Sequence, residues 1–172
     1  MKKKKLLLII EIVIIAVVAG CSVIDGKLAC PSIKTKVTVA RDNWGVPHIT
    51  AENSHDAYFA LGFTIAQDRL FQMDIQRRLA KGELAEILGT ELIPIDSKFR
   101  TYLFKHTGEK MITRLAKTNP EAIAIIDAYL DGVNYFIETG SLPVEFKLLG
   151  YKPAPFTKID PAAFQGYELL LR

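Results

Sequence analysis

The feature that most constrains the fold is an apolar helical segment that begins near Ala57. Its apolar side chains surround the helix axis instead of forming one stripe, and they are Ala57, Phe59, Ala60, Leu61, Phe63, Ile65 and Ala66. A helix that is apolar on every side must be buried. Asn53 and Asp56, three residues apart, resemble a capping box at its start. The sequence therefore predicts a buried central helix on which the other segments pack.

Charged residues continue this helix after a polar interruption at residues 67–69. Asp74 stands three and four residues before Arg77 and Arg78, and side chains at these spacings meet on a helix. Buried charges need partners. The pattern favours an internal ion-pair network that fixes helix packing; direct contact with a substrate or an active site is the alternative.

A β-hairpin is predicted before the central helix. The β-prone runs 37–40 and 46–50 flank Asp42, Asn43, Trp44 and Gly45, which favour a turn with a positive φ at the glycine. After the central helix, Gly82 interrupts the chain, a short turn covers 83–88 and Gly89 provides a stop. The expected fold class is α+β, mainly helical with an N-terminal hairpin.

The second half of the chain predicts three more helices. The first is expected to follow a loop over 90–95, to be capped by Asp96 or Ser97 and to end near Lys117. The second runs from Pro120 to about Gly140, and the third opens at Asp160. Residues 141–157 are rich in proline and glycine and are expected to form an irregular connection. Expected buried anchors are Phe99, Leu103, Met111 and Leu115 in the first helix and Phe146, Leu148, Leu149 and Tyr151 in the connection.

The first twenty residues read as a targeting segment. Four lysines precede an apolar stretch, and Val18-Ala19-Gly20-Cys21 resembles a bacterial lipobox. We expect cleavage and lipidation at Cys21, with residues 21–35 as a tether and the protein anchored in the bacterial cell envelope. Glu11 lies inside the apolar stretch, so an uncleaved anchor or poor export stays open. Cys30 is expected to be a bystander thiol.

Charge and metal-ligand patterns exclude several functions. The chain of 172 residues carries 22 basic and 19 acidic residues. Without the first twenty residues it is formally neutral, so neither a basic patch nor nucleic-acid binding is expected. The three histidines, His48, His55 and His106, have no metal-ligand spacing, and no metal, cofactor or catalytic role is assigned to them. Asp42 and Asp68 could pair in space, which the sequence does not show.

Several motifs occur together in one order along the chain. They are R-D-x-x-G-V-P-H-I, D-A-x-F-A-L-G-F, A-Q-D-R-L-F-Q-M-D and G-E-L-A-E-I-L-G, followed by Tyr129 to Asn134, Leu142 to Phe146 and Leu149 to Pro153. This pattern resembles the N-terminal, smaller-subunit part of the penicillin acylase family. The resemblance covers residues 36–172 and implies a subunit region truncated at its C-terminus. It also implies one part of the αββα fold of the N-terminal-nucleophile hydrolases.

The resemblance implies an amide hydrolysis whose catalytic groups lie on a missing larger chain. In such enzymes a serine at the start of that chain attacks the amide carbonyl, and its own α-amine acts as the base. An α-amine suits this role because its pKa is about 7.7–8.0, near the working pH. No catalytic residue is therefore expected in this chain, and calcium is possible only in the complete enzyme.

Two functions remain open from the sequence. The first is a fragment of an amidase that hydrolyses a linear amide between an acyl group and an amine, where the amine is a β-lactam nucleus or a homoserine lactone. Its last helix would then line the acyl pocket, with Leu169 and Arg172 as candidate substrate contacts. The second is a lipid-anchored module that binds without catalysis.

Overall fold

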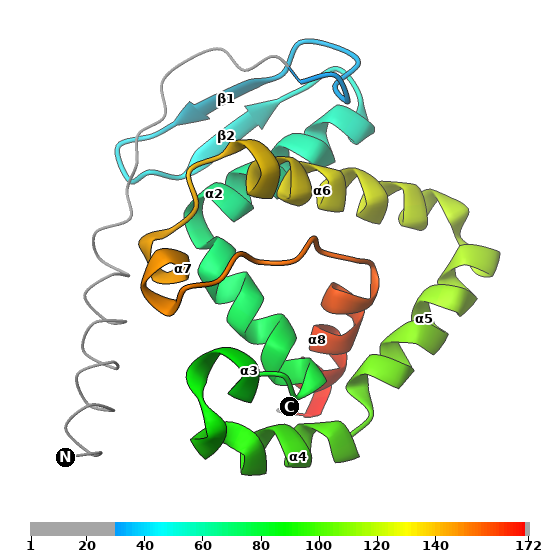
Figure 1. The fold of residues 1–172 in the computed structure, drawn as a ribbon. Coiled ribbons are helices and arrows are strands. Elements are labelled where there is room, and N and C mark those ends of the chain that lie inside the picture. Colours follow the sequence, from blue (N-terminus) through cyan, green and yellow to red (C-terminus); the bar gives the residue numbers. More distant parts are fainter. Residues whose placement is uncertain (1–29, 171–172) are drawn as a thin grey trace.

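The computed structural model describes residues 30–170, so the predictions for Cys21 and Arg172 lie outside the described residues. In chain order the elements are β1 (Thr38–Arg41), β2 (Pro47–Thr50), α2 (Ser54–Lys81), α3 (Ala85–Leu88), the 3₁₀ helix η1 (Thr90–Leu92), α4 (Ile93–Thr101), α5 (Phe104–Thr118), α6 (Pro120–Thr139), α7 (Val144–Leu149) and α8 (Ile159–Leu170). Helices dominate, with one two-stranded antiparallel sheet, as the expected α+β class requires. In Figure 1, α6, α5 and α4 run around α8, and α2 crosses the centre.

The central helix forms as predicted. Asn53 caps α2, because its side chain accepts a hydrogen bond from the backbone N–H of Asp56. The predicted polar interruption coincides with a kink, since Arg69 has φ −139° and ψ 19° inside the helix. Gly82 ends the helix in the left-handed conformation, with φ 68°. The local signals of α2 therefore agree with its structure.

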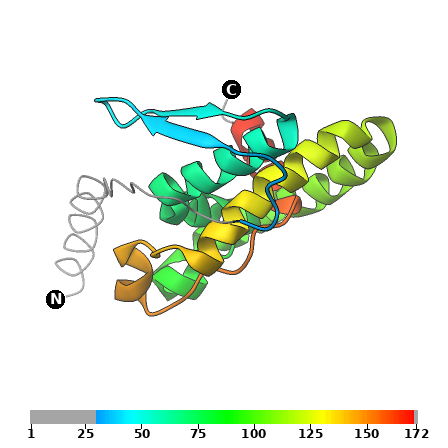
Figure 2. The ribbon, with the colours of Figure 1, turned by 90° about the horizontal axis from the view of Figure 1, so that it is seen from above.

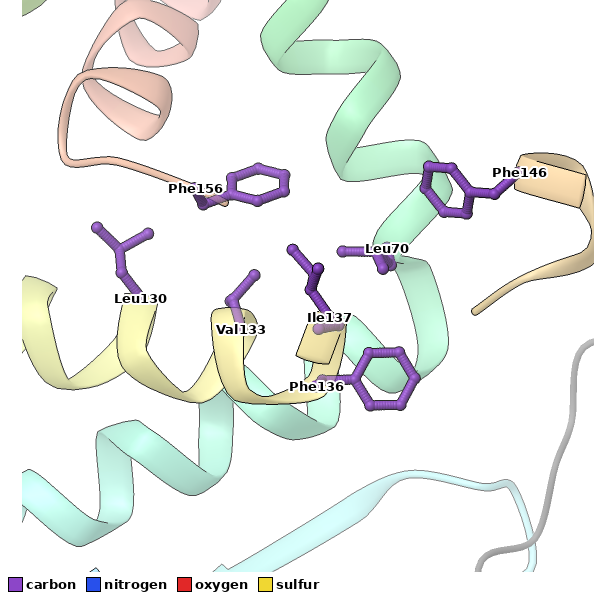
Figure 3. Close-up of a cluster of buried hydrophobic side chains, with 8 residues drawn as sticks. Leu70, Leu130, Val133, Phe136, Ile137, Phe146 and Phe156 are labelled. Atoms are coloured by element: carbon purple, nitrogen blue, oxygen red, sulfur yellow. The ribbon is translucent and has the colours of Figure 1, made fainter. Parts of the chain in front are cut away.

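The hydrophobic core lies between α2 and α6. Leu70 of α2 packs with a group of buried side chains from α6, α7 and the connection that follows α7. Figure 3 shows these side chains converging, and they are Leu70, Leu130, Val133, Phe136, Ile137, Phe146 and Phe156. The helix predicted from Pro120 forms, and the apolar residues Leu130, Val133 and Ile137, which recur on it at helical spacing, lie in the core.

The hairpin lies along one side of the helices (Figure 2). Thr38 pairs with Thr50 and Arg41 pairs with Pro47 in antiparallel register. The turn residue Gly45 has φ 77°, as predicted for this position. Trp44 at the same turn is 91% exposed. The hairpin is therefore a ribbon whose turn projects from the helical body.

The helix predicted from Asp96 or Ser97 to Lys117 is wrong as a single helix. It is two helices, α4 and α5, which are separated at Leu103 in the left-handed conformation with φ 56° and ψ 31°. Leu103 and Met111, predicted to be buried, are 58% and 38% exposed. The break changes the direction of the chain between α4 and α5. Residues of the two helices therefore do not share one buried face, as a single continuous helix would require.

Three smaller predictions also need correction. Residues 90–95 are helical and not a loop, because η1 and the start of α4 occupy them. Asp96 does not cap its own helix but accepts hydrogen bonds from the N–H groups of Leu84 and Ala85, which starts α3 instead. The connection 141–157 contains the short helix α7, and Leu148 on it is 64% exposed.

Among the described helices, none is both long enough and apolar enough to cross a membrane.

Candidate functional site: a buried ion-pair network

Asp74 lies at the centre of a buried ion-pair network. Its carboxylate is 0% exposed and accepts hydrogen bonds from Nε of Arg77 at 2.7 Å and Nε of Arg78 at 2.9 Å. The hydroxyl of Tyr151 donates a third bond at 2.7 Å. The carboxylate is thus saturated by donors, which offsets the cost of burying its charge.

Arg77 joins the central helix to the chain that leads into α8. Its guanidinium donates hydrogen bonds to the backbone carbonyls of Ala154, at 2.8 Å, and Pro155, at 3.2 Å. The same group lies 3.9 Å from the centre of the Phe156 ring, in a cation–π contact. Arg77 therefore fixes the irregular segment before α8 to α2, in addition to the hydrogen bond from Tyr151 to Asp74.

Asp160 extends the network into the first turn of α8. Its Oδ2 accepts hydrogen bonds from the N–H and the hydroxyl of Thr157, at 2.6 and 3.0 Å. It also forms ion pairs with Lys81 and, at 3.8 Å, with Arg77. An acidic residue in the first turn suits the positive end of the helix dipole. Arg77 and Lys81, in the last turns of α2, thus hold the first turn of α8 through Asp160.

The network shifts the titration of two of its members. Burial raises the pKa of the Tyr151 hydroxyl, and its hydrogen bond to Asp74 raises it further. Burial alone would lower the pKa of the Arg78 guanidinium, but the hydrogen bond and charge of Asp74 outweigh it and raise the pKa. Both pKa increases favour the protonated forms of Tyr151 and Arg78, which are the forms that donate the hydrogen bonds to Asp74. The predicted internal ion-pair network is confirmed, with partners drawn from the protein itself.

A second polar cluster fixes the hairpin to the kink in α2. Arg41 donates hydrogen bonds to both carboxylate oxygens of Asp68, at 2.7 and 2.9 Å, and to the side chain of Gln67. It also bonds the carbonyl of Gly45 in the hairpin turn. The polar interruption of the central helix is therefore the docking point of the hairpin.

Asp42 and Asp68 do not form the acid pair that the sequence left open. Asp68 pairs with Arg41, while Oδ2 of Asp42 lies 3.2 Å from Nε2 of His48. The N–H of Val46 bonds Asp42 and, with the His48 contact, lowers the pKa of its carboxyl although burial acts in the opposite direction. Each acid thus has its own cationic or hydrogen-bonding partner.

The other predicted site residues are dispersed. Leu169 is on α8 and is 67% exposed, and Cys30 is a half-buried free thiol. His55 contacts Asp56, and His106 lies 3.6 Å from Glu109. Within residues 30–170 no cluster of histidine, cysteine and acidic side chains suits a metal ion. Sequence reasoning found Asp74, Arg77 and Arg78 but did not connect them with Tyr151, expected only as a buried anchor, or with Asp160, expected only at the start of the last helix.

Comparisons with known proteins agree with this architecture. The family model described as penicillin amidase matches residues 36–170. Penicillin acylase 2 proenzyme from Pseudomonas sp. is 42% identical over 144 residues, which are 82% of this chain and 18% of that protein. Penicillin G acylase from Escherichia coli is 31% identical over 74% of this chain and 16% of its own length. An acyl-homoserine lactone acylase from Pseudomonas syringae is 30% identical over 81% of this chain and 17% of its own length.

A solved structure shows the same fold. A chain of the thermostable penicillin G acylase from Alcaligenes faecalis superposes with a TM-score of 0.66 and 31% identity, over 75% of this chain and 69% of that one. The chain therefore spans less than a fifth of the curated relatives that it matches but most of one chain in this crystal structure. On the family match and on these identities, the chain belongs to the penicillin amidase family.

Proposed function

We propose that this chain is the smaller-subunit part of an enzyme that hydrolyses a linear amide between an acyl group and an amine. The observation that carries the proposal is the identity of 30–42% to penicillin acylases and an acyl-homoserine lactone acylase across most of the described chain. The amine of the substrate would be of the β-lactam or homoserine-lactone type. The relatives are named as a penicillin acylase and an acyl-homoserine lactone acylase, which supports both amine types.

The catalytic groups of this enzyme would lie on a larger partner chain. The match covers only 16–18% of the curated relatives but 69% of one chain of the solved structure, which supports a division between a small and a large chain. The two together would complete the αββα fold, with calcium as a possible ligand of the complete enzyme. The serine nucleophile, its α-amine base and the donors for the oxyanion would come from the larger chain.

This chain would contribute a wall of the acyl pocket. The network of Asp74, Arg77 and Asp160 holds α8 against α2, so the exposed end of α8 has a fixed position. Leu169 and Arg172 would face the acyl group from that end. We further propose that lipidation of Cys21 holds the enzyme at the bacterial cell envelope; Cys21→Ser should release it from membranes or block its processing.

The test is reconstitution with the larger chain of a relative. The full chain is assayed alone and after co-expression with that partner, on chromogenic phenylacetyl and long-chain acyl amides. We expect no turnover by the chain alone and turnover by the pair. The partner alone and a pair whose partner has its first serine replaced by alanine are the controls. A folded, processed pair without turnover would support a non-catalytic binding module instead.

A further inference from the structure

Basic residues are concentrated on the two helices around the α4–α5 corner. Residues 93–118 hold six basic residues but only two acidic ones, of which Asp96 is buried and bonded to backbone N–H groups. The six are Lys98, Arg100, Lys105, Lys110, Arg114 and Lys117. The expectation that this formally neutral chain has no basic patch was therefore wrong, because the neutral total conceals a strong local surplus.

Four of these side chains are cations without a counter-charge. Lys105, Lys110, Arg114 and Lys117 are exposed and form no ion pair within residues 30–170. Lys110, Arg114 and Lys117 line one shallow surface hollow of about 390 Å³ along α5, together with His106, Thr113 and a single acidic residue, Glu109. Gly108 faces the other way, since a Cβ there would lie 3.0 Å from the backbone nitrogen of Ala163 on α8. We call the four exposed cations Lys105, Lys110, Arg114 and Lys117 the basic stripe.

An apolar corner adjoins the basic stripe. A second hollow of about 410 Å³ shares His106 and Glu109 with the first. Its other charged lining residues are Lys81, Arg100, Lys105 and the acidic Glu83, and its apolar ones are Ala80, Phe99, Leu103 and Phe104. Leu103 is 58% exposed and occupies the left-handed region, which a leucine rarely adopts. In Figure 1 this corner lies at the opposite end of the molecule from the hairpin. A cationic face thus continues directly into protruding apolar surface.

We propose that the basic stripe and the Leu103 corner dock on the surface of an anionic lipid bilayer. Anionic headgroups would neutralise the four unpaired cations, and the exposed leucine would enter the headgroup boundary. A protein partner is a poorer occupant, because three of the four cations are lysines and lysine is depleted in protein interfaces whereas arginine is enriched. A nucleic acid would match the charge but leave the apolar corner without a partner.

Lysine footprinting tests the proposal at the level of single residues. The full Cys21→Ser chain is mixed with vesicles of one-third phosphatidylglycerol and two-thirds phosphatidylcholine, or of phosphatidylcholine alone, and acetylated with a water-soluble reagent. We expect acetylation of Lys105, Lys110 and Lys117 to fall severalfold on the anionic vesicles only. The exposed Lys147 and Lys152, which lie outside the stripe, are the internal reference. Equal protection of both sets, or protection on neutral vesicles, would overturn the proposal.

Charge reversal gives an independent measurement. The pair of changes Lys110→Glu and Lys117→Glu should weaken partition to the anionic vesicles at least about tenfold, because each basic residue near such a surface is worth several-fold in affinity. The matched control, Lys147→Glu with Lys152→Glu, changes the net charge equally and should have a much smaller effect. Equal losses in the two variants would contradict the stripe. So would footprints that appear without lipid once the larger chain is bound, since the stripe would then be a subunit interface.

Discussion

Asp74 shows how one buried carboxylate can organise distant parts of this chain. It binds two arginines from its own helix and the hydroxyl of Tyr151, which is 77 residues away in sequence. A buried ion pair adds little stability compared with apolar packing, but removing the central carboxylate takes away the main buried counter-charge of both arginines. Arg77 then keeps only the 3.8 Å contact with Asp160 and Arg78 only the exposed Glu86 as acidic partners. The network therefore makes the packing of α2 dependent on a single residue.

Replacing Asp74 should be strongly destabilising. In Asp74→Ala the guanidinium groups of Arg77 and Arg78 lose their buried counter-charge, so we expect the free energy of unfolding to fall by about 3–5 kcal/mol. Denaturant unfolding measures the change. The control is Asp127→Ala, which removes a half-exposed ion pair with Lys158 and should cost under about 1 kcal/mol. If a complete enzyme carrying Asp74→Ala folded and assembled normally but lost turnover, the network would belong to the active site.

Asp56 is a second buried carboxylate with a different task. Its oxygens accept hydrogen bonds from the N–H groups of Lys34 and Thr35, from the Thr35 hydroxyl and from the amide of Asn53, and one lies 3.0 Å from Nδ1 of His55. Burial would raise the pKa of this carboxyl, but these bonds, led by His55, lower it well below its usual range. Asp56 thus fixes the segment before the hairpin to the start of α2.

The depressed pKa of Asp56 predicts a pH dependence. A carboxyl whose folded pKa lies below its unfolded pKa of about 3.9 stabilises the fold above that pH, and this stabilisation is lost as the pH falls through the folded pKa. Wild type should therefore exceed Asp56→Asn in melting temperature by a constant amount above about pH 5, and the gap should shrink below about pH 4. Thermal unfolding across this range measures it. Asp131→Asn, at an exposed position, is the control, and a gap independent of pH would contradict the prediction.

At the scale of elements, the crossing of α2 and α6 depends on two glycines. A Cβ on Gly62 would lie 1.9 Å from the backbone carbonyl oxygen of Tyr129, and one on Gly132 would lie 2.0 Å from that of Phe59. Each helix therefore presents a glycine to the backbone of the other. The main helical pair is as close as backbones allow, so neither position has room for a methyl group.

This close approach reverses the usual effect of a glycine-to-alanine change. Helix propensity alone predicts that Gly132→Ala would stabilise the protein by about 1 kcal/mol. Because the helices must move apart, we expect a loss of about 1–3 kcal/mol or more instead. Ala124→Gly, on the exposed face of the same helix, calibrates propensity and should cost about 1 kcal/mol. Chemical denaturation of both variants decides the matter, and a stabilised Gly132→Ala would show that the helices are less closely packed.

The elements that the sequence predicts well are those with local signals. Asn53 and the Asn119-Pro120 pair cap α2 and α6 where expected, because a cap is recognised from adjacent residues. The break between α4 and α5 is different, since Leu103 in the left-handed region carries no signal of the kind that glycine or asparagine gives. A glycine inside a helix is ordinarily a weak point, but Gly108 in α5 provides close contact with α8.

In the candidate site, too, the contacts within one helix could be predicted from the sequence and the long-range contacts could not. The spacing of Asp74, Arg77 and Arg78 on one helix predicts their contact. Their partners Tyr151 and Asp160 come from segments more than 75 residues away, and a single sequence does not reveal such pairings. Arg41 was likewise predicted only as part of a motif, and its four hydrogen bonds to the turn and to the kink of α2 appear only in the folded chain.

For the whole molecule, α8 is the element whose position decides the proposed function. It packs against α5 and α2 through Ala162 and Ala163, which are buried, and its first turn is held by Lys81 through Asp160. Leu169, two turns further on, is 67% exposed. A helix fixed at its first turns and exposed at its last one is suited to form a wall that a second chain completes.

Leu169 should therefore influence acyl selectivity in the reconstituted enzyme. If its side chain borders the acyl group, Leu169→Phe would reduce the space for a long acyl chain, and differences of a few methylene groups in a pocket change kcat/KM by roughly tenfold or more. We expect the ratio of kcat/KM for long-chain over phenylacetyl amides to fall about tenfold in this variant and to rise or stay unchanged in Leu169→Ala. Leu148→Phe is the matched control, because Leu148 is equally exposed, at 64%, but lies on α7. Equal selectivity in all three variants would remove Leu169 from the pocket, whatever the activity of the pair.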